Sequence, residues 1–247
     1  MQLSPDYSSG YINRELMVLI IIPVLNEYEN LLLFLKGIDA LDSPDRYIKF
    51  IFVDGYSTDG SYELLQTMNH DSIIIRSAPR GIYEAYNKGL DRAEDAEYIM
   101  FMGADDSVLP GLIALCESID RGVIRHPLIV AQSQFSPGSE ITSHRFDQYN
   151  LLGSNFCHQS ILVRSDLFLE NRFDVRYRVM ADWVMNLQFI KKYGHLIHYT
   201  PLLISRYVKG GYSGTSRDLR WEICHYALKI RYLGYRKCLK YLLAKWR

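Results

Sequence analysis

The sequence predicts an α/β protein with a mixed, mainly parallel sheet flanked by helices. Two observations support this fold class. Short apolar runs alternate with segments of helical pattern through the first half of the chain, and helical crossovers between buried strands are typical of a doubly wound parallel sheet. The chain of 247 residues, 48% hydrophobic and 23% charged, is also long enough to bury a full core. Polar residues beyond the carboxyl ends of the strands are therefore the first candidates for a site.

The first half of the chain contains four expected strands. Continuous apolar runs predict strands at residues 17–22, 49–53, 72–75 and 98–102. Helical patterns predict helices at residues 27–40, 60–68 and 82–93, with a further helix after Pro110. Three of these helices lie between successive strands, as the crossovers of a parallel sheet must.

The regular alternation breaks after Arg125. Residues 128–131 and 159–163 have strand character, residues 132–139 form a polar stretch rich in Ser, Gly and Pro, and a helix is predicted at 182–192. No internal repeat separates this half from the first, so we expect a more mixed region of the same unit.

The cysteine content and the lack of long apolar segments indicate the cellular compartment in which the protein is expected. The cysteines at 116, 157, 224 and 238 have neither the close pairs of a zinc site nor the density of a disulfide scaffold, which favours a reducing environment. The polar N-terminus does not resemble a signal peptide, and no apolar run approaches the roughly 20 residues of a membrane span. We expect a cytoplasmic protein, with peripheral contact to the inner face of the membrane as an option.

Two stretches at predicted strand ends carry clustered carboxylates. "FVDGYSTDGS" places Asp54 at the end of one strand, and "YIMFMGADD" ends another strand with Asp105 and Asp106. Such turns can hold a polar ligand through side chains and amides. Each has a simpler interpretation, in which the Asp side chains stabilise a turn or cap the following helix.

Several motifs in order resemble one known family. "IIPVLNE" (21–27), "VDGYSTDGS" (53–61), "PRGIYEAYNKGL" (79–90) and "MGADD" (102–106) look like family 2 glycosyltransferases of the GT-A fold. Downstream, "HQSILVRSDLF" (158–168), "RFDVRYRVMADWVMNLQF" (172–189) and "GGYSGTS" (210–216) are similar to a subgroup that builds bacterial exopolysaccharide and O-antigen chains. The resemblance covers residues 15–216, so we expect a catalytic domain at 1–216 and a tail at 217–247.

The resemblance implies a binding pocket for a nucleotide-sugar donor. Asp54 would read the nucleotide base, typically uracil, and a carboxylate accepting a base N–H is a sound pairing. Pro23, Asn26 and Glu27 would line the same pocket. Asn87 and Lys88 would reach the donor, although a solvated helix Lys explains Lys88 nearly as well.

The resemblance also implies that the paired carboxylates Asp105 and Asp106 form a metal site. Asp106 would bind Mn²⁺ or Mg²⁺ directly against the donor diphosphate, and Asp105 would contact the sugar or ribose or share the metal. Capping of the next helix is the alternative role. One departure concerns Gly103, because many family members have Asp or Asn there and so complete a D-x-D pattern.

By the same resemblance, Asp182 in "MADWVMNL" would be the base that deprotonates the acceptor hydroxyl in an inverting transfer. Here Ala181 replaces the Glu that often precedes it, and helix capping is the competing role. His158 and Gln159 would line the acceptor or diphosphate side, although a lone His is often structural. Gly211 and Ser213 belong to a loop that would close over the donor.

The tail beyond the resemblance is strongly basic. Residues 217–247 contain nine Lys or Arg and two acidic residues, while the whole chain is neutral. A helical face combines the apolar residues Tyr235, Leu239, Leu242, Leu243 and Trp246. Such a basic amphipathic helix can lie on an anionic membrane, pack on the catalytic core, or join a second copy of the chain. Nucleic acid is not expected as a partner, since no recognised module is present.

Together these features predict an inverting, metal-dependent transfer of a sugar from a nucleotide sugar, a UDP-sugar by preference, to a glycan acceptor linked to lipid. The alternative is a degenerate GT-A protein that binds a nucleotide or membrane without turnover. Two further classes are disfavoured. Tyr56 stands where haloacid-dehalogenase phosphatases carry a second Asp, and neither G-x-G-x-x-G nor G-K-[ST] follows the first strand.

Overall fold

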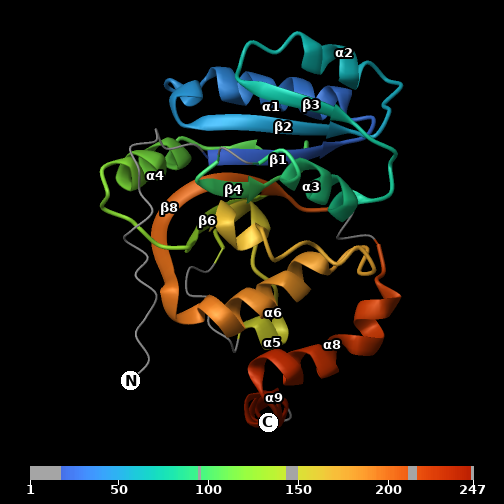
Figure 1. The fold of residues 1–247 in the computed structure, drawn as a ribbon, viewed down its shortest axis with the longest axis vertical. Coiled ribbons are helices and arrows are strands. Elements are labelled where there is room, and N and C mark those ends of the chain that lie inside the picture. The colour runs from blue at the N-terminus through green and yellow to red at the C-terminus, as the bar shows by residue number, and fades with distance from the viewer. Residues whose placement is uncertain (1–17, 94–95, 143–149, 211–215, 246–247) are drawn as a thin grey trace.

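The computed structural model describes residues 18–93, 96–142, 150–210 and 216–245 (Figure 1). Its strands and helices follow the chain in this order: β1 (Val18–Val24), α1 (Tyr28–Asp39), β2 (Ile48–Asp54), α2 (Ser61–Gln66), β3 (Ser72–Arg76), α3 (Ile82–Leu90), β4 (Tyr98–Phe101), β5 (Ser107–Val108), α4 (Gly111–Asp120), β6 (Leu128–Ser136), α5 (Asn150–Gly153), β7 (Ile161–Arg164), α6 (Ala181–Tyr193), β8 (Ile197–Val208), α8 (Leu219–Leu233) and α9 (Tyr235–Lys245). Short 3₁₀ helices occupy Pro44–Arg46, His158–Ser160, Ser165–Phe168 and Gly194–Leu196.

The strands form one sheet in the order β3-β2-β1-β4-β7-β6-β8-β5. β1 pairs in parallel with β2 and β4, and β2 pairs in parallel with β3. β7 runs antiparallel to both β4 and β6, while β6 and β8 are parallel. The predicted mixed, mainly parallel sheet is confirmed. Each of its antiparallel pairs includes β7 or β8, strands from the second half of the chain, where the strand–helix alternation breaks down.

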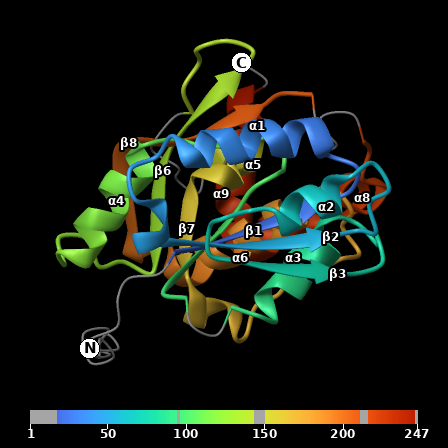
Figure 2. The same ribbon diagram turned by 90° about the horizontal axis from the view of Figure 1, so that it is seen from above.

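The two faces of the sheet bury alternate residues of each strand. On β1, Ile20 and Ile22 face a cluster with Leu31 and Phe34 of α1, and this cluster extends to α4. Ile21, pointing the other way, joins a cluster formed by α3 and α6. Figure 2 shows α1 and α3 on different sides of the sheet. Full burial on both faces explains the continuous apolar runs in the sequence.

β6 is longer than its predicted 128–131. It continues to Ser136 because β8 pairs with its polar half, Gln132 opposite Leu203 and Ser133 opposite Ser205. The hydroxyls of Ser133 and Ser205 hydrogen-bond to each other, and both side chains are fully buried. Polar residues with such partners can occupy a buried strand, which the sequence pattern alone did not reveal.

The C-terminal tail folds as two helices, α8 and α9. Gly234, with φ of +92°, separates them in a conformation that favours glycine. Trp221 of α8 packs against Trp183 of α6 at 4.6 Å between ring centroids, and buried Lys229 donates a hydrogen bond to the carbonyl of Leu152. α8 is therefore joined to the main core. None of the helices in the described ranges combines the length and apolar character that crossing a bilayer takes.

Candidate active site

A cavity of about 1260 Å³ opens at the carboxyl ends of β1, β2 and β4. These ends meet because the strands are parallel, with Val24 of β1 opposite Asp54 of β2 and Ile21 opposite Phe101 of β4. Residues between Pro23 and Val208 line it, among them Glu27, Gly55, Tyr83, Tyr86, Gly103, Asp105, Asp106, Asn155, His158, Gln159 and Asp182. The cavity is where the fold class predicts a ligand site.

Asp106 is a buried carboxylate at the floor of this cavity, only 2% exposed. Its Oδ2 atom accepts hydrogen bonds from the Gly103 amide and from Nε2 of Gln159, both at 2.8 Å, and Oδ1 accepts one from the Val208 amide at 3.2 Å. Burial, reinforced by the charge of Asp105, raises the pKa of Asp106 to about 6, although the Gly103 and Gln159 hydrogen bonds oppose this. Oδ1, which accepts one hydrogen bond, has a second lone pair for a further ligand.

Asp105 lies beside Asp106 and is more exposed. Burial raises its pKa as well. The carboxylate of Asp105 occupies the space beside Gly103, where an added Cβ would meet Asp105 Oδ1 and lie 3.2 Å from Asp106 Oδ2. The glycine that departs from the D-x-D pattern thus makes room for the Asp105 side chain.

Two neighbouring carboxylates suit a hard divalent cation, because Mn²⁺ and Mg²⁺ prefer oxygen ligands. Across the described ranges, no group of three or more His, Cys, Asp or Glu side chains is arranged to hold a metal ion. The pair therefore fits a site in which the protein supplies one or two carboxylates and a bound substrate and water supply the remaining oxygens.

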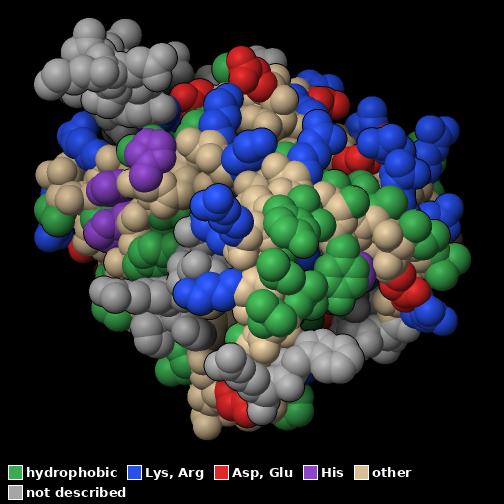
Figure 3. All heavy atoms as spheres, turned by 90° about the horizontal axis from the view of Figure 1, so that it is seen from below, with side chains coloured by type: hydrophobic (Ala, Val, Ile, Leu, Met, Phe, Trp, Pro, Cys, Tyr) green, Lys and Arg blue, Asp and Glu red, His purple; other side chains and the backbone are tan. Residues whose placement is uncertain are grey.

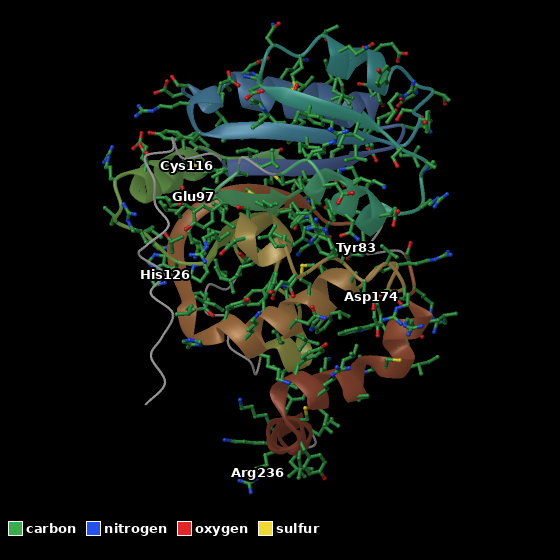
Figure 4. The ribbon with its side chains drawn as sticks, in the orientation of Figure 1. Tyr83, Glu97, Cys116, His126, Asp174 and Arg236 are labelled. Carbon is green, nitrogen blue, oxygen red and sulfur yellow. The ribbon has the colours of Figure 1, made fainter. Side chains whose placement is uncertain are left out.

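Asp182 faces the cavity from the first turn of α6. Its Oδ1 atom lies 2.8 Å from the hydroxyl of Tyr83 and accepts the Trp183 amide, while Oδ2 accepts Nδ2 of Asn155 at 2.7 Å. In Figure 4, Tyr83 lies on the side of α3 that faces α6. These donors hold the carboxylate in one orientation and leave Oδ2 able to accept one more hydrogen bond.

His158 connects the two carboxylate groups. Its Nδ1 atom lies 3.5 Å from Asp182 Oδ2, and its Nε2 atom lies 3.4 Å from the hydroxyl of Tyr86. Tyr86 in turn donates to the carbonyl of Met102, just before the turn that carries Asp105 and Asp106. Gln159 hydrogen-bonds Asp106, so the predicted pair His158 and Gln159 contacts both parts of the site.

The predicted donor residues divide into two groups. Pro23 and Glu27 line the cavity. Asp54 is fully buried and does not line it, because its carboxylate accepts the amides of Tyr56 and Ser57 and Nε of Arg76, each at 3.1 Å. Asp54 thus shapes the loop after β2, and Gly55 is the residue of that loop that borders the cavity.

Asn26, Asn87 and Lys88 also lie outside the cavity lining. Asn26 accepts the amide of Thr58, and Asn87 forms two hydrogen bonds with the backbone of Phe173, which tie α3 to the segment before α6. Lys88 is exposed on α3. Gly211 and Ser213, the predicted loop residues, fall outside the described residues.

Sequence reasoning missed Tyr83 and Asn155 as partners of Asp182. Tyr83 lies inside the motif "PRGIYEAYNKGL", and Asn155 lies just outside another motif, three residues before His158. Their positions next to matched motifs were the available signal, but only the fold brings α3 within reach of α6.

The chain is similar in sequence to known proteins. Residues 19–160 match the profile of Glycosyl transferase family 2. The PGL/p-HBAD biosynthesis glycosyltransferases of Mycobacterium bovis and Mycobacterium tuberculosis are 30% identical to the chain over 214 residues, which cover 82% of this chain and 81% of theirs.

Solved structures share the architecture at low identity. S. aureus TarS 1–349 in complex with UDP-GlcNAc superposes with a TM-score of 0.66 at 14% identity, covering 82% of this chain and 62% of that chain. The mannosyltransferase PcManGT from Pyrobaculum calidifontis, in complex with GDP-Man and Mn²⁺, gives 0.57 at 20% identity and covers 79% and 58%. The chain thus spans about three fifths of these solved chains. The family and the fold that the motifs predicted are confirmed: the chain belongs to glycosyl transferase family 2 and is a glycosyltransferase with the GT-A fold.

Proposed function

We propose that the protein is an inverting glycosyltransferase that moves a sugar from a UDP-sugar to a hydroxyl group of a lipid-linked glycan in bacterial surface polysaccharide synthesis. The observation that carries this proposal is the position of Asp182 in the same cavity as the carboxylate pair Asp105 and Asp106. An oriented base, and a carboxylate pair that could hold a cation against the departing diphosphate, are the two parts that such a transfer needs in one cavity.

The donor would lie along the ends of β1, β2 and β4, with Pro23, Glu27 and Gly55 around its nucleoside. Asp54 would act through the loop that it holds, by fixing the amides of Tyr56 and Ser57. Two structural neighbours with the same fold were solved with nucleotide sugars, UDP-GlcNAc and GDP-Man, which supports a donor of this class.

Asp106, assisted by Asp105, would hold the divalent cation that the family implies. When bound, such a cation offsets the negative charge that develops on the departing diphosphate. Mn²⁺ accompanies GDP-Man in one structural neighbour, and the oxygen ligands of this pair suit Mn²⁺ or Mg²⁺ equally.

Asp182 would accept the proton of the acceptor hydroxyl through Oδ2. As the acceptor oxygen bonds to the anomeric carbon, the bond from that carbon to the diphosphate oxygen breaks, and attack from the opposite face inverts the configuration. Tyr83 and Asn155 keep the carboxylate oriented through this step. The acceptor enters on the side of His158, which borders the same cavity.

Calorimetric titration with UDP and with GDP, each with Mn²⁺ and with a chelator, tests the donor site. We expect UDP to bind only with the metal and Asp106→Ala to lose this binding, since the diphosphate would lack its cation. Asp42→Ala, which changes an exposed Asp far from the cavity, is the control. Metal-independent binding, or unchanged binding in Asp106→Ala, would contradict the assignment.

Asp182→Asn tests the base separately. It keeps the size and most hydrogen-bonding capacity of the side chain but cannot take the proton, so sugar transfer should stop while UDP binding stays unchanged. An unchanged turnover would remove Asp182 from the proposed mechanism.

A further inference from the structure

The tail helices expose apolar side chains in ordered rows. On α8, Leu219, Ile223, Tyr226 and Ile230 are exposed at positions i, i+4, i+7 and i+11, which lie along one helical face. On α9, Tyr235, Leu239 and Leu243 are exposed at positions i, i+4 and i+8, also along one side of the helix. Isolated exposed hydrophobic residues are ordinary, but rows of this length on two successive helices mark an interaction surface.

These rows do not face the core. α8 buries Trp221 and Lys229 away from its row, whereas Leu233, on the same face as the row at the C-terminal end of the helix, is also buried. α9 buries Cys238. Of the apolar face predicted for α9, Tyr235, Leu239 and Leu243 are exposed, Leu242 is half-buried, and Trp246 lies outside the described residues. Packing on the catalytic core therefore does not account for Tyr235, Leu239 and Leu243.

Basic side chains surround the rows. Arg220 and Arg231 of α8 and Arg236 and Lys240 of α9 are exposed. Figure 3 looks at the end of the molecule formed by these helices and shows hydrophobic side chains gathered with Lys and Arg side chains beside them. Figure 4 places Arg236 at the outer edge of that end. In the sequence, residues 217–247 hold nine Lys or Arg and only two acidic residues, although the whole chain is neutral.

The combination of apolar rows and positive charge favours one class of binding partner over the others. A second copy of the chain would bring two strongly positive surfaces together, which like-charge repulsion disfavours. A nucleic acid would match the charge but leave the central apolar side chains without a partner. An anionic lipid surface satisfies both, because acyl chains accept the apolar rows while lipid headgroups meet Lys and Arg.

We propose that the exposed rows of α8 and α9, namely Leu219, Ile223, Tyr226, Ile230, Tyr235, Leu239 and Leu243, form a surface that lies on an anionic membrane. The Tyr side chains suit the boundary between headgroups and acyl chains. This surface goes beyond the proposed transfer reaction, and its binding can be measured without catalysis, so failure of one proposal leaves the other intact.

Vesicle flotation tests the surface with the full chain. We expect the protein to float with vesicles of phosphatidylcholine and phosphatidylglycerol in equal parts, to stay unbound with phosphatidylcholine alone, and to detach in high salt. The double variant Leu219→Gln with Ile223→Gln should lose at least about tenfold in partitioning, since two apolar anchors are removed. The double variant Arg231→Gln with Arg236→Gln should lose about fivefold for each Arg.

Leu33→Gln is the matched control, because Leu33 on α1 is 67% exposed against 65% for Leu219 and lies at the other end of the molecule. It should bind vesicles like the wild type. Unfolding midpoints verify that each variant folds. Equal binding to neutral vesicles, or wild-type partitioning of both double variants, would overturn the proposal. So would a dimer in sedimentation that the Leu219 and Ile223 changes dissociate while vesicles remain unbound.

Discussion

The carboxylate of Asp218 holds the backbone amide of Val179 at 2.9 Å, across 39 residues of chain. The same Oδ2 atom accepts the amide of Met180 at 3.1 Å, and Oδ1 caps α8 by accepting the amide of Trp221. Val179 and Met180 lead directly into the first turn of α6, which carries Asp182. The first residues of the tail thus position the helix of the proposed base.

Asp218→Ala should therefore affect both stability and transfer. Loss of the helix cap and of the two hydrogen bonds to the amides of Val179 and Met180 is expected to lower the free energy of unfolding by about 3 kcal/mol. Sugar transfer should fall more than UDP binding, because α6 loses its anchor while the donor side is untouched. Denaturant unfolding and calorimetry measure the two effects. Glu222→Ala changes an exposed residue one turn later, and its free energy of unfolding should stay within about 0.5 kcal/mol of the wild-type value.

Tyr83→Phe should slow transfer by about tenfold, because the hydroxyl that lies 2.7 Å from the Val179 carbonyl and 2.8 Å from Asp182 Oδ1 would no longer hold the carboxylate and the start of α6 in place. Burial and the nearby Asp182 raise the pKa of Tyr83 well above its usual value. The hydroxyl therefore remains a donor through neutral pH, and the loss should be the same across that range. Turnover at several pH values measures it, with exposed Tyr28→Phe as the control; wild-type turnover would contradict the role.

Gly103→Ala should weaken metal-dependent UDP binding by about tenfold while hardly changing stability. The added Cβ enters the space of Asp105 Oδ1, a flexible carboxylate end that can move aside. Displacement of that carboxylate disturbs the arrangement of the Asp105 and Asp106 oxygens. It should lower the free energy of unfolding by about 0.5 kcal/mol or less. Calorimetry with Mn²⁺ and thermal unfolding separate the effects. Gly37→Ala on α1, where a Cβ meets nothing within 4 Å, should leave binding unchanged.

His70 makes stability depend on pH. Burial lowers its pKa, but hydrogen bonds and charges from Asp45 and Asp39, each 2.9 Å from a ring nitrogen, raise it above the usual value overall. The folded state therefore holds the proton more tightly. This stabilisation is fully present below about pH 6.5, the unfolded value, and is lost as pH rises through the higher folded pKa.

His70→Gln should consequently be most destabilising at about pH 5.5 and approach the wild type at about pH 8. Urea unfolding at both pH values measures the difference. His195→Gln, an exposed His on the same chain, should show no such trend. A difference that grows with pH would contradict the sign of the shift.

Much of the fold follows from local pattern. The run at residues 17–22 became β1 at Val18–Val24 because its residues are buried on both faces, and the i, i+3, i+7 spacing of Leu31, Phe34 and Ile38 produced α1. Strand ends, and hence the placement of Asp105 and Asp106 beside the cavity, were predictable because parallel strands end at one edge. The order of the strands beyond β4 could not be predicted, because no local sequence signal specifies which strand β7 pairs with.

The sequence by itself determined the family, the alternating elements and the carboxylates of the site, because these depend on residue type and short-range spacing. Tertiary structure alone decided their partners. Tyr83 reaches Asp182 across 99 residues, and the side chains of Asp54 and Asn87 hydrogen-bond backbone groups. Tyr235, Leu239 and Leu243 of α9 are exposed. Each outcome depends on how helices pack against the sheet, and packing is set by the whole core, which short-range spacing does not record.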